Sequence, residues 1–245
     1  MPSATIPFSI YLFAGLSLTV GFGSLIVFAF FLYLGSFPWV VLPLGVTEGL
    51  LFDVALCFAF FLQHTGMTRI RAKSKQFLGR NFKAIFSIVS GVFLVAFMVL
   101  WQKSSLSLVS ADGFWGGLLR VIFFIGVAGQ LWTTFSLTSI DPFGVQDLLA
   151  RPGSKANSEA PSLVVKNAYA WVRHPAYFTM LLLIWGYPDL TADRLLLNVL
   201  FTVWIVMGTL YEERELAALF GEEYLTYQRE VPMLIPYRLP KRNRR

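Results

Sequence analysis

The chain has 245 residues, of which 56% are hydrophobic and only 14% are charged, whereas about a quarter of a soluble domain is charged. This composition, with 24 Phe, 9 Tyr and 7 Trp, excludes an ordinary soluble domain. The net charge is +6, yet residues 1–68 contain no Lys or Arg, so the basic surplus is concentrated in the rest of the chain.

Six apolar stretches are candidate membrane spans, because about 20 residues at roughly 1.5 Å each cross a hydrocarbon core about 30 Å thick. In chain order they are residues 9–34, 39–62, 84–101, 115–138, 176–188 and 195–211. The fifth is short for a full crossing, so we expect residues 176–211 to form a helical hairpin. The fold class expected is an all-α, polytopic helical membrane protein with about five to six transmembrane helices and a C-terminal cytoplasmic amphipathic helix. We expect no cleavable signal peptide.

The first four spans carry few chemical groups. Cys57 is the single cysteine, which excludes an intrachain disulfide and a cysteine metal cluster, and we expect it to be a small buried hydrophobe and the protein to hold no metal. Glu48 and Asp53 lie about 140° apart around the second helix. They therefore do not form the polar stripe that a transporter would need.

The basic residues predict the topology. Of the 20 Lys and Arg, 17 lie in the loop 69–83, in the polar segment 141–175 or after Tyr211. With six spans these three regions share one side of the membrane, which the positive-inside rule assigns to the cytoplasm. We expect both termini to be cytoplasmic, the lipid bilayer to be a partner, and nucleic acid not to be one.

Three regions follow from this reading. Residues 1–140 form an N-terminal four-helix membrane region, and residues 141–175 form a cytoplasmic loop that contains the linker-like stretch 151–161. Residues 176–245 form the helical hairpin and the C-terminal helix, and the reactive side chains cluster there and just before.

The first cluster is Trp171-Val172-Arg173-His174-Pro175-Ala176-Tyr177. Pro175 suits the first turn of a helix, where free N–H groups and the positive dipole end attract an anion. Arg173 beside such a helix start is expected to hold a carboxylate or phosphate. His174 is a hydrogen-bond donor, a base or a ring packed on a flat ligand, and Tyr177 lies one turn further. The alternative is an interfacial anchor, with Arg173 reaching to lipid headgroups and Tyr177 in the aromatic belt.

The second cluster begins with Glu212 and Glu213 at the inner end of the last span. Carboxylates near hydrocarbon are costly unless they are paired or hydrated, which marks them as candidates to bind an ammonium or a ribose diol. An apolar stripe follows and could cover the cytoplasmic face as a lid: Leu216, Leu219, Phe220, Tyr224 and Tyr227. The alternative is an amphipathic helix lying on lipid. Together the two clusters suit S-adenosylmethionine, and the lack of a glycine-rich loop after a strand excludes a Rossmann-type methyltransferase.

The ordered motifs R-H-P-x-Y at 173–177, E-E-x-x-L at 212–216, F-G-x-x-Y-x-x-Y at 220–227 and V-P-x-x-I-P at 231–236 resemble an integral-membrane methyltransferase superfamily. That superfamily contains the isoprenylcysteine carboxyl methyltransferases and the phospholipid methyltransferases. Residues 63–69, 141–144 and 232–236 look like its bacterial methanethiol S-methyltransferase branch. Thr179 stands where the family usually has glycine, and we expect it to narrow the groove beside the cofactor.

The resemblance implies an S-adenosylmethionine-dependent enzyme of the bacterial inner membrane that methylates a small thiol, such as methanethiol to dimethyl sulfide. It implies a cofactor site lined by Tyr169, Arg173, His174, Pro175, Tyr177, Glu212, Glu213 and Tyr224. The alternatives are a methyltransferase for a prenylcysteine carboxylate or a lipid amine, and a non-enzymatic membrane protein or transporter.

The chemistry of the methyl acceptor decides whether the enzyme needs a base. A carboxylate needs no base, but a simple thiol is mostly protonated near neutrality, because even the cysteine thiol has a pKa near 8.5. His64 and His174 are the two histidines of the chain and the candidate catalytic residues. His64 ends the second span, beside Gln63, and is the candidate base that meets the cofactor's methyl group from the opposite wall. The alternative is a hydrogen-bonded interface histidine.

Overall fold

The computed structural model describes residues 6–37, 39–70, 77–136, 141–150, 163 and 165–239. The linker-like stretch 151–161 and several of the bases used for the topology, among them Arg71, Lys73 and Lys75, lie outside the described residues. The chain forms two compact units. Unit 1 comprises Met1–Ser105 and Ile140–Ala160, and unit 2 comprises Leu106–Ser139 and Pro161–Arg245.

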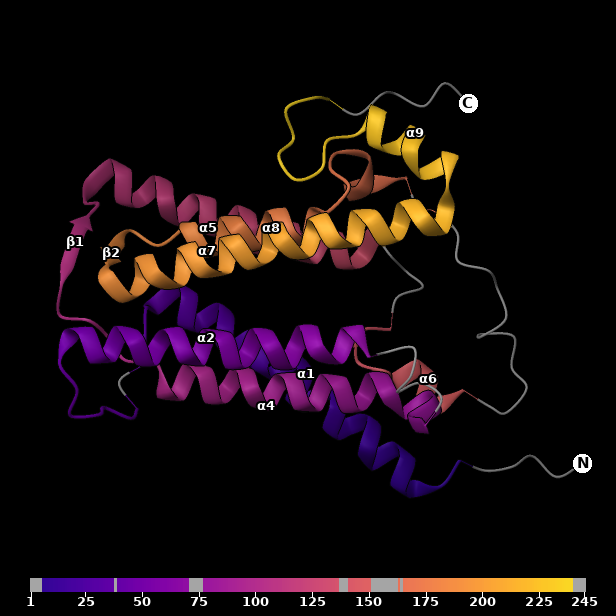
Figure 1. The fold of residues 1–245 in the computed structure, drawn as a ribbon, viewed down its shortest axis with the longest axis horizontal. Helices are drawn as coiled ribbons and strands as arrows, with labels where there is room; N and C mark the ends of the chain where they lie inside the picture. The colour runs from indigo at the N-terminus through magenta and orange to yellow at the C-terminus, as the bar shows by residue number, and fades with distance from the viewer. Residues whose placement is uncertain are drawn as a thin grey trace, which may run out of the picture. The chain divides into compact units, whose positions relative to one another are not determined.

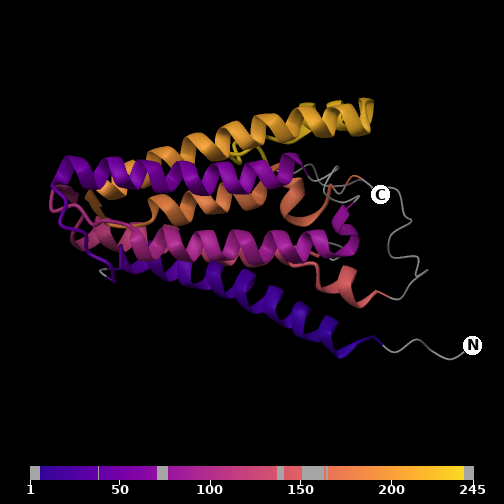
Figure 2. The ribbon, with the colours of Figure 1, turned by 60° about the horizontal axis from the view of Figure 1, so that its bottom comes forward.

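Unit 1 is a helical layer centred on one helix. Its elements are α1 (Phe8–Leu34), α2 (Val46–Arg69), the short 3-10 helix η1 (Gly79–Asn81), α4 (Phe82–Leu100) and α6 (Val145–Leu149). Both α1 and α2 pack on α4. Figure 2 shows α1 beside α4 over part of its length and diverging from it toward the N-terminal end of α1. Small residues allow this approach, since a Cβ on Gly91 of α4 would lie 2.8 Å from the carbonyl oxygen of Val20 in α1.

A short capped helix, α6, packs against both α1 and α4. The Asp141 carboxylate accepts hydrogen bonds from the backbone N–H groups of Val145 and Asp147, both at 3.0 Å, so it caps α6. Gly144 has a left-handed backbone (φ 72°), and a Cβ there would lie 2.6 Å from the Ala84 nitrogen. The D-P-F-G motif is therefore a compact turn seated on α4.

Unit 2 contains a hairpin of helices closed by a small sheet (Figure 1). Its elements are β1 (Ser107–Ser110), α5 (Gly113–Ser136), the 3-10 helix η3 (Asn167–Ala170), α7 (Pro175–Trp185), β2 (Asp189–Thr191), α8 (Ala192–Phe220) and α9 (Glu222–Glu230). β1 and β2 are antiparallel, with Val109 opposite Leu190. α7 packs against both α5 and α8.

Two glycines of α5 bring α7 close. A Cβ on Gly126 would lie 3.0 Å from the Thr179 carbonyl oxygen, and one on Gly129 would lie 2.3 Å from the Thr179 methyl carbon. The Thr179 hydroxyl donates to the Pro175 carbonyl at 2.9 Å within its own helix. The side chain expected to narrow a cofactor groove is thus buried against α5.

The predicted fold class is confirmed. Among the described residues five helical segments are long and apolar enough to cross a membrane, and α7, with 11 residues, is shorter. The main difference lies in the last span, predicted over 195–211. The helix α8 continues to Phe220, so Glu212 and Glu213 stand on one unbroken helix with the membrane segment.

Candidate active site

The R-H-P segment lies at the start of α7 and is fixed by its backbone. Pro175 is the first residue of the helix, where a missing N–H costs nothing. The N–H groups of Arg173 and His174 donate to the carbonyls of Pro232 and Met233, at 2.9 and 3.1 Å. The V-P-x-x-I-P motif therefore holds the R-H-P motif in place, although the two are far apart in the sequence.

Glu212 and Glu213 have different environments, because neighbours on a helix point about 100° apart. The Glu213 side chain is buried, at 9% exposure, whereas that of Glu212 is 42% exposed. The Glu212 carboxylate lies 3.6 Å from His174 Nδ1. The sequence predicted the same role for both carboxylates, but only the Glu212 side chain is exposed enough to contact a ligand.

The Glu213 carboxylate is the centre of a buried polar cluster. Its Oε1 accepts from Arg173 Nε at 2.9 Å and from the Tyr224 hydroxyl at 2.7 Å, and it lies 2.7 Å from His174 Nε2. Its Oε2 accepts from Arg173 Nη2 and Gln228 Nε2, both at 2.7 Å. Five donors occupy the two oxygens, so Glu213 has no lone pair left for a ligand's ammonium.

Arg173 is fully engaged by the protein. Nε and Nη2 form a fork on Glu213, and Nη1 donates to the carbonyls of Gln228, at 3.0 Å, and Val231. The side chain is only 8% exposed. The alternative in which Arg173 reaches to lipid headgroups is therefore wrong. A direct clamp on a ligand carboxylate would require these bonds to be given up, so Arg173 acts here as a framework residue.

His174 lies between the two carboxylates. Its Nε2 is 2.7 Å from Glu213 and its Nδ1 is 3.6 Å from Glu212, while its ring stacks on that of Tyr177 at 5.7 Å between centroids. Burial lowers the pKa of His174, but the bonds to Glu212 and Glu213 raise it by more, so the pKa is above its usual 6.5. An imidazolium in this position donates a proton and does not accept one from a thiol.

The tyrosines of α9 and η3 complete the cluster. Tyr224 and Tyr227 are 1% and 5% exposed, and the Tyr227 hydroxyl donates to the Tyr169 carbonyl at 2.5 Å. Burial, with the nearby Glu212 carboxylate, raises the pKa of Tyr169 to about 12, so its hydroxyl stays protonated. The face of α9 that carries these rings is covered by the site, so α9 does not present it to lipid.

Sequence reasoning missed two residues of the cluster, Gln228 and Val231. Gln228 follows Tyr224 by four residues, which places both on one face of α9. Val231 contributes only its backbone carbonyl, which no side-chain pattern reveals. The signal that could have found Gln228 was this spacing from Tyr224 on a helix that begins directly after α8.

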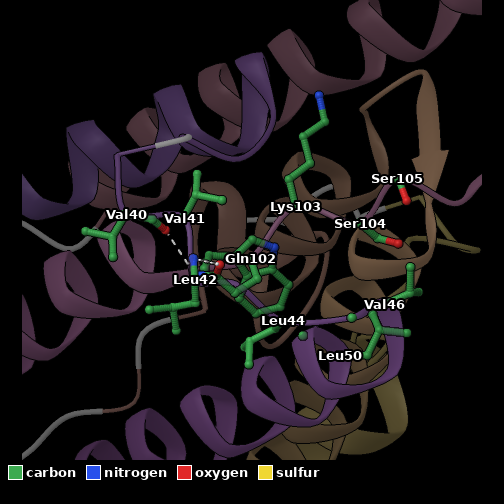
Figure 3. Close-up of a pocket in the computed structure, with 13 residues that line it drawn as sticks. Val40, Val41, Leu42, Leu44, Val46, Leu50, Gln102, Lys103, Ser104 and Ser105 are labelled. Carbon is green, nitrogen blue, oxygen red and sulfur yellow. Dashed lines mark hydrogen bonds between the residues drawn. The ribbon is translucent and has the colours of Figure 1, made fainter.

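The other predicted catalytic residue, His64, belongs to unit 1. Its ring lies between those of Phe60 and Phe86, with centroids at 5.7 and 5.0 Å. A separate pocket of about 180 Å³ in unit 1 is lined by residues 40–42, 44–46, 49–50 and 101–105 and includes none of the predicted site residues (Figure 3). Across the described ranges no group of three or more His, Cys, Asp or Glu side chains is placed to hold a metal ion.

Known methyltransferases are similar in sequence to this chain. A methanethiol S-methyltransferase of Pseudomonas sp. (strain GM41(2012)) is 34% identical over 209 residues, which cover 84% of this chain and 78% of the relative. One of Pseudomonas deceptionensis is 32% identical over 196 residues, or 76% and 72%. A protein-S-isoprenylcysteine O-methyltransferase of Rattus norvegicus is 28% identical over 155 residues, or 59% and 51%. No family model and no solved structure matches the chain.

Proposed function

The chain belongs to the family of methanethiol S-methyltransferases, within the superfamily of membrane methyltransferases that includes the isoprenylcysteine enzymes, and we propose that it methylates a small thiol such as methanethiol. The proposed methyl donor is S-adenosylmethionine. The observation that carries the assignment of the donor site is the pair of adjacent carboxylates in unit 2, one saturated by protein donors and one exposed.

Glu212 is the residue proposed to contact the donor. Its exposed carboxylate offers acceptors for an ammonium or a ribose diol, and the stacked rings of His174 and Tyr177 stand beside it. Glu213, Arg173 and Tyr224 hold these groups in position through the buried cluster. This division agrees with the chemistry of the donor, whose ammonium and hydroxyl groups can donate hydrogen bonds to an exposed carboxylate. Pro175 and Tyr169 complete the proposed lining.

The reaction requires the thiol sulfur to be aligned with the donor's methyl group, and the thiol must lose one proton. S-adenosylmethionine supplies a methyl group on a sulfonium: the thiol sulfur's electron pair forms the new C–S bond, while the pair of the breaking bond stays on the donor's sulfur. The proton of the thiol must go to a base. We assign that role to His64, since the ion pairs of His174 favour its protonated form.

The proposed setting is a bacterial inner membrane with both termini in the cytoplasm. The helices make the protein a multi-pass membrane protein, and the clustering of bases in three regions supports this orientation. In that orientation the exposed Glu212, about two turns before the end of α8, faces the compartment that contains a water-soluble donor. An apolar acceptor would arrive through the bilayer.

Purified protein in detergent, with labelled S-adenosylmethionine, tests the proposal. The acceptors are methanethiol, a prenylcysteine analogue and phosphatidylethanolamine, and we expect label on the thiol alone. Label on the prenylcysteine carboxylate or on the lipid amine would replace the thiol with that acceptor. Absence of donor binding would refute the enzyme site.

Two variants test the residue roles. Glu212→Gln should weaken donor binding at least tenfold without a change in folding, and Glu222→Gln, an exposed acid on α9, is the matched control that should not. His64→Ala should lower the methylation rate and leave donor binding unchanged. An unaltered rate would remove His64 from the reaction.

A further inference from the structure

Gln63 is a half-buried residue of unit 1 whose amide is hydrogen-bonded at one end only. Its Nε2 donates to the Met67 sulfur and to the Ser90 hydroxyl, both at 3.2 Å. A thioether sulfur only accepts, so the contact with Met67 on the same helix identifies the NH₂ end of the amide, and the bond to Ser90 ties that end to α4. Its carbonyl oxygen, Oε1, is buried and has no hydrogen-bond partner among the residues that the structure describes.

An acceptor in this state has an energetic cost. A buried oxygen without a donor loses about 1–3 kcal/mol relative to one that is paired. Native structures contain few such atoms, and those that occur often have a functional role or bind a group from outside the chain. The Gln63 oxygen is held rigidly by the partners of its own amide nitrogen, so it is prepared for a donor that the protein does not supply.

The neighbours of this oxygen indicate what kind of donor suits it. His64 is the next residue, and its ring is held between Phe60 and Phe86. Phe86 and Ser90 are four residues apart on α4, so the partners of His64 and Gln63 lie on successive turns of one helix face. Aromatic rings attract divalent sulfur, by about 0.3–1.5 kcal/mol for each sulfur–ring contact.

We propose that Gln63 Oε1 accepts the S–H bond of the methyl acceptor and selects a neutral thiol over a carboxylate. This inference rests on the proposed function, whose acceptor it specifies as a small thiol that binds in its protonated form. A thiol carries a hydrogen to donate at neutral pH, whereas an ionised carboxylate would turn lone pairs toward the lone pairs of Oε1.

The test variant is Gln63→Met, which keeps the length of the side chain and removes the carbonyl oxygen. We expect the KM for ethanethiol to rise about 3–10-fold, the loss of one modest hydrogen bond, with kcat within about twofold of the wild type. Gln63→Asn keeps a carbonyl on a shorter side chain, and its KM for ethanethiol should lie between those of the wild type and Gln63→Met. The control is Thr68→Val on the same helix, where an exposed hydroxyl bonds only to its own turn, and this variant should behave as the wild type.

A second measurement does not require turnover. Propanethiol should raise the thermal stability of the wild type in the absence of the donor, and the Gln63→Met protein should lose this effect. If Gln63→Met or Gln63→Asn folds and retains both the wild-type KM and the propanethiol effect, the inference is overturned. A wild type that binds propanethiol through Gln63 but methylates no thiol would instead refute the proposed function.

Discussion

Replacing Glu213 with glutamine should dismantle the buried cluster of unit 2. The substitution keeps the shape of the side chain but removes its charge and turns one of its two oxygens into an NH₂ group. Whichever way the amide lies, that group meets donors, since Arg173 reaches both oxygens and each oxygen has at least one further donor. The variant therefore loses one acceptor oxygen, and its new NH₂ group points at protein donors that have no acceptor left.

The magnitude follows from the burial of the partners. The side chains of Arg173 and His174 are 8% and 4% exposed, so neither cation can recover the lost carboxylate's contribution from water. Removing one member of a buried ion pair costs about 3–5 kcal/mol. At about 2–4 °C for each kcal/mol in a chain of this size, the midpoint of thermal unfolding should fall by on the order of 10 °C.

Thermal unfolding in detergent measures this, and the neighbouring carboxylate provides the control. Glu212→Gln should unfold within about 0.5 kcal/mol of the wild type, because its side chain is 42% exposed. Glu212→Gln should lose donor affinity at unchanged stability, and Glu213→Gln should lose stability first. Equal midpoints for Glu213→Gln and the wild type would refute the reasoning that the buried cluster organises this site.

Three further variants examine separate contacts. Arg173→Lys keeps the charge but cannot form the fork on Glu213 while also reaching the carbonyl of Gln228. We expect its free energy of unfolding, measured by thermal unfolding, to fall by about 2 kcal/mol. A fall below about 0.5 kcal/mol would show that the charge alone suffices. Because the bonds to Glu212 and Glu213 outweigh burial and hold the pKa of His174 above 6.5, the stabilisation by its cation is complete below pH 6.5 and is lost as pH rises through the raised pKa. The unfolding midpoint should therefore fall at alkaline pH in the wild type and not in His174→Gln, and parallel pH curves would contradict this. Gly129→Ala should destabilise by about 1–3 kcal/mol through its clash with the Thr179 methyl group, and adding Thr179→Ser, which deletes that methyl, should restore most of the loss unless α5 and α7 pack differently.

The sequence predicted the helices well because hydrophobic length is a local property. The α1 and α5 segments begin and end within two residues of their predicted bounds. The end of α8 was misplaced by nine residues, because a hydropathy pattern ends where the lipid ends and a helix need not. The strands β1 and β2 have three or four residues each and pair across a long stretch of sequence, so no local alternation revealed them.

The candidate site was predictable in membership but not in roles. The sequence brought Arg173, His174, Glu213 and Tyr224 together through their motifs, and the structure places all four in one cluster. It did not predict that Arg173 and Glu213 use up each other's hydrogen-bonding groups. Which of the adjacent residues Glu212 and Glu213 points inward depends on how the helix is rotated about its axis. The Gln63 oxygen was also invisible, since an unpaired acceptor is defined by its surroundings.

The backbone bonds between the R-H-P segment and residues 232–233 have a consequence for the order in which the protein is made. Val231, which also accepts from Arg173, is synthesised 58 residues after it, at a rate of about 5–20 residues per second. For several seconds a nascent chain holds an arginine and a histidine at the membrane edge without their final partners. The buried cluster around Glu213 is thus completed late in biosynthesis. A ribosome that stalls before Tyr224 leaves a chain in which Arg173 can pair with Glu213 but still lacks the carbonyls of Gln228 and Val231.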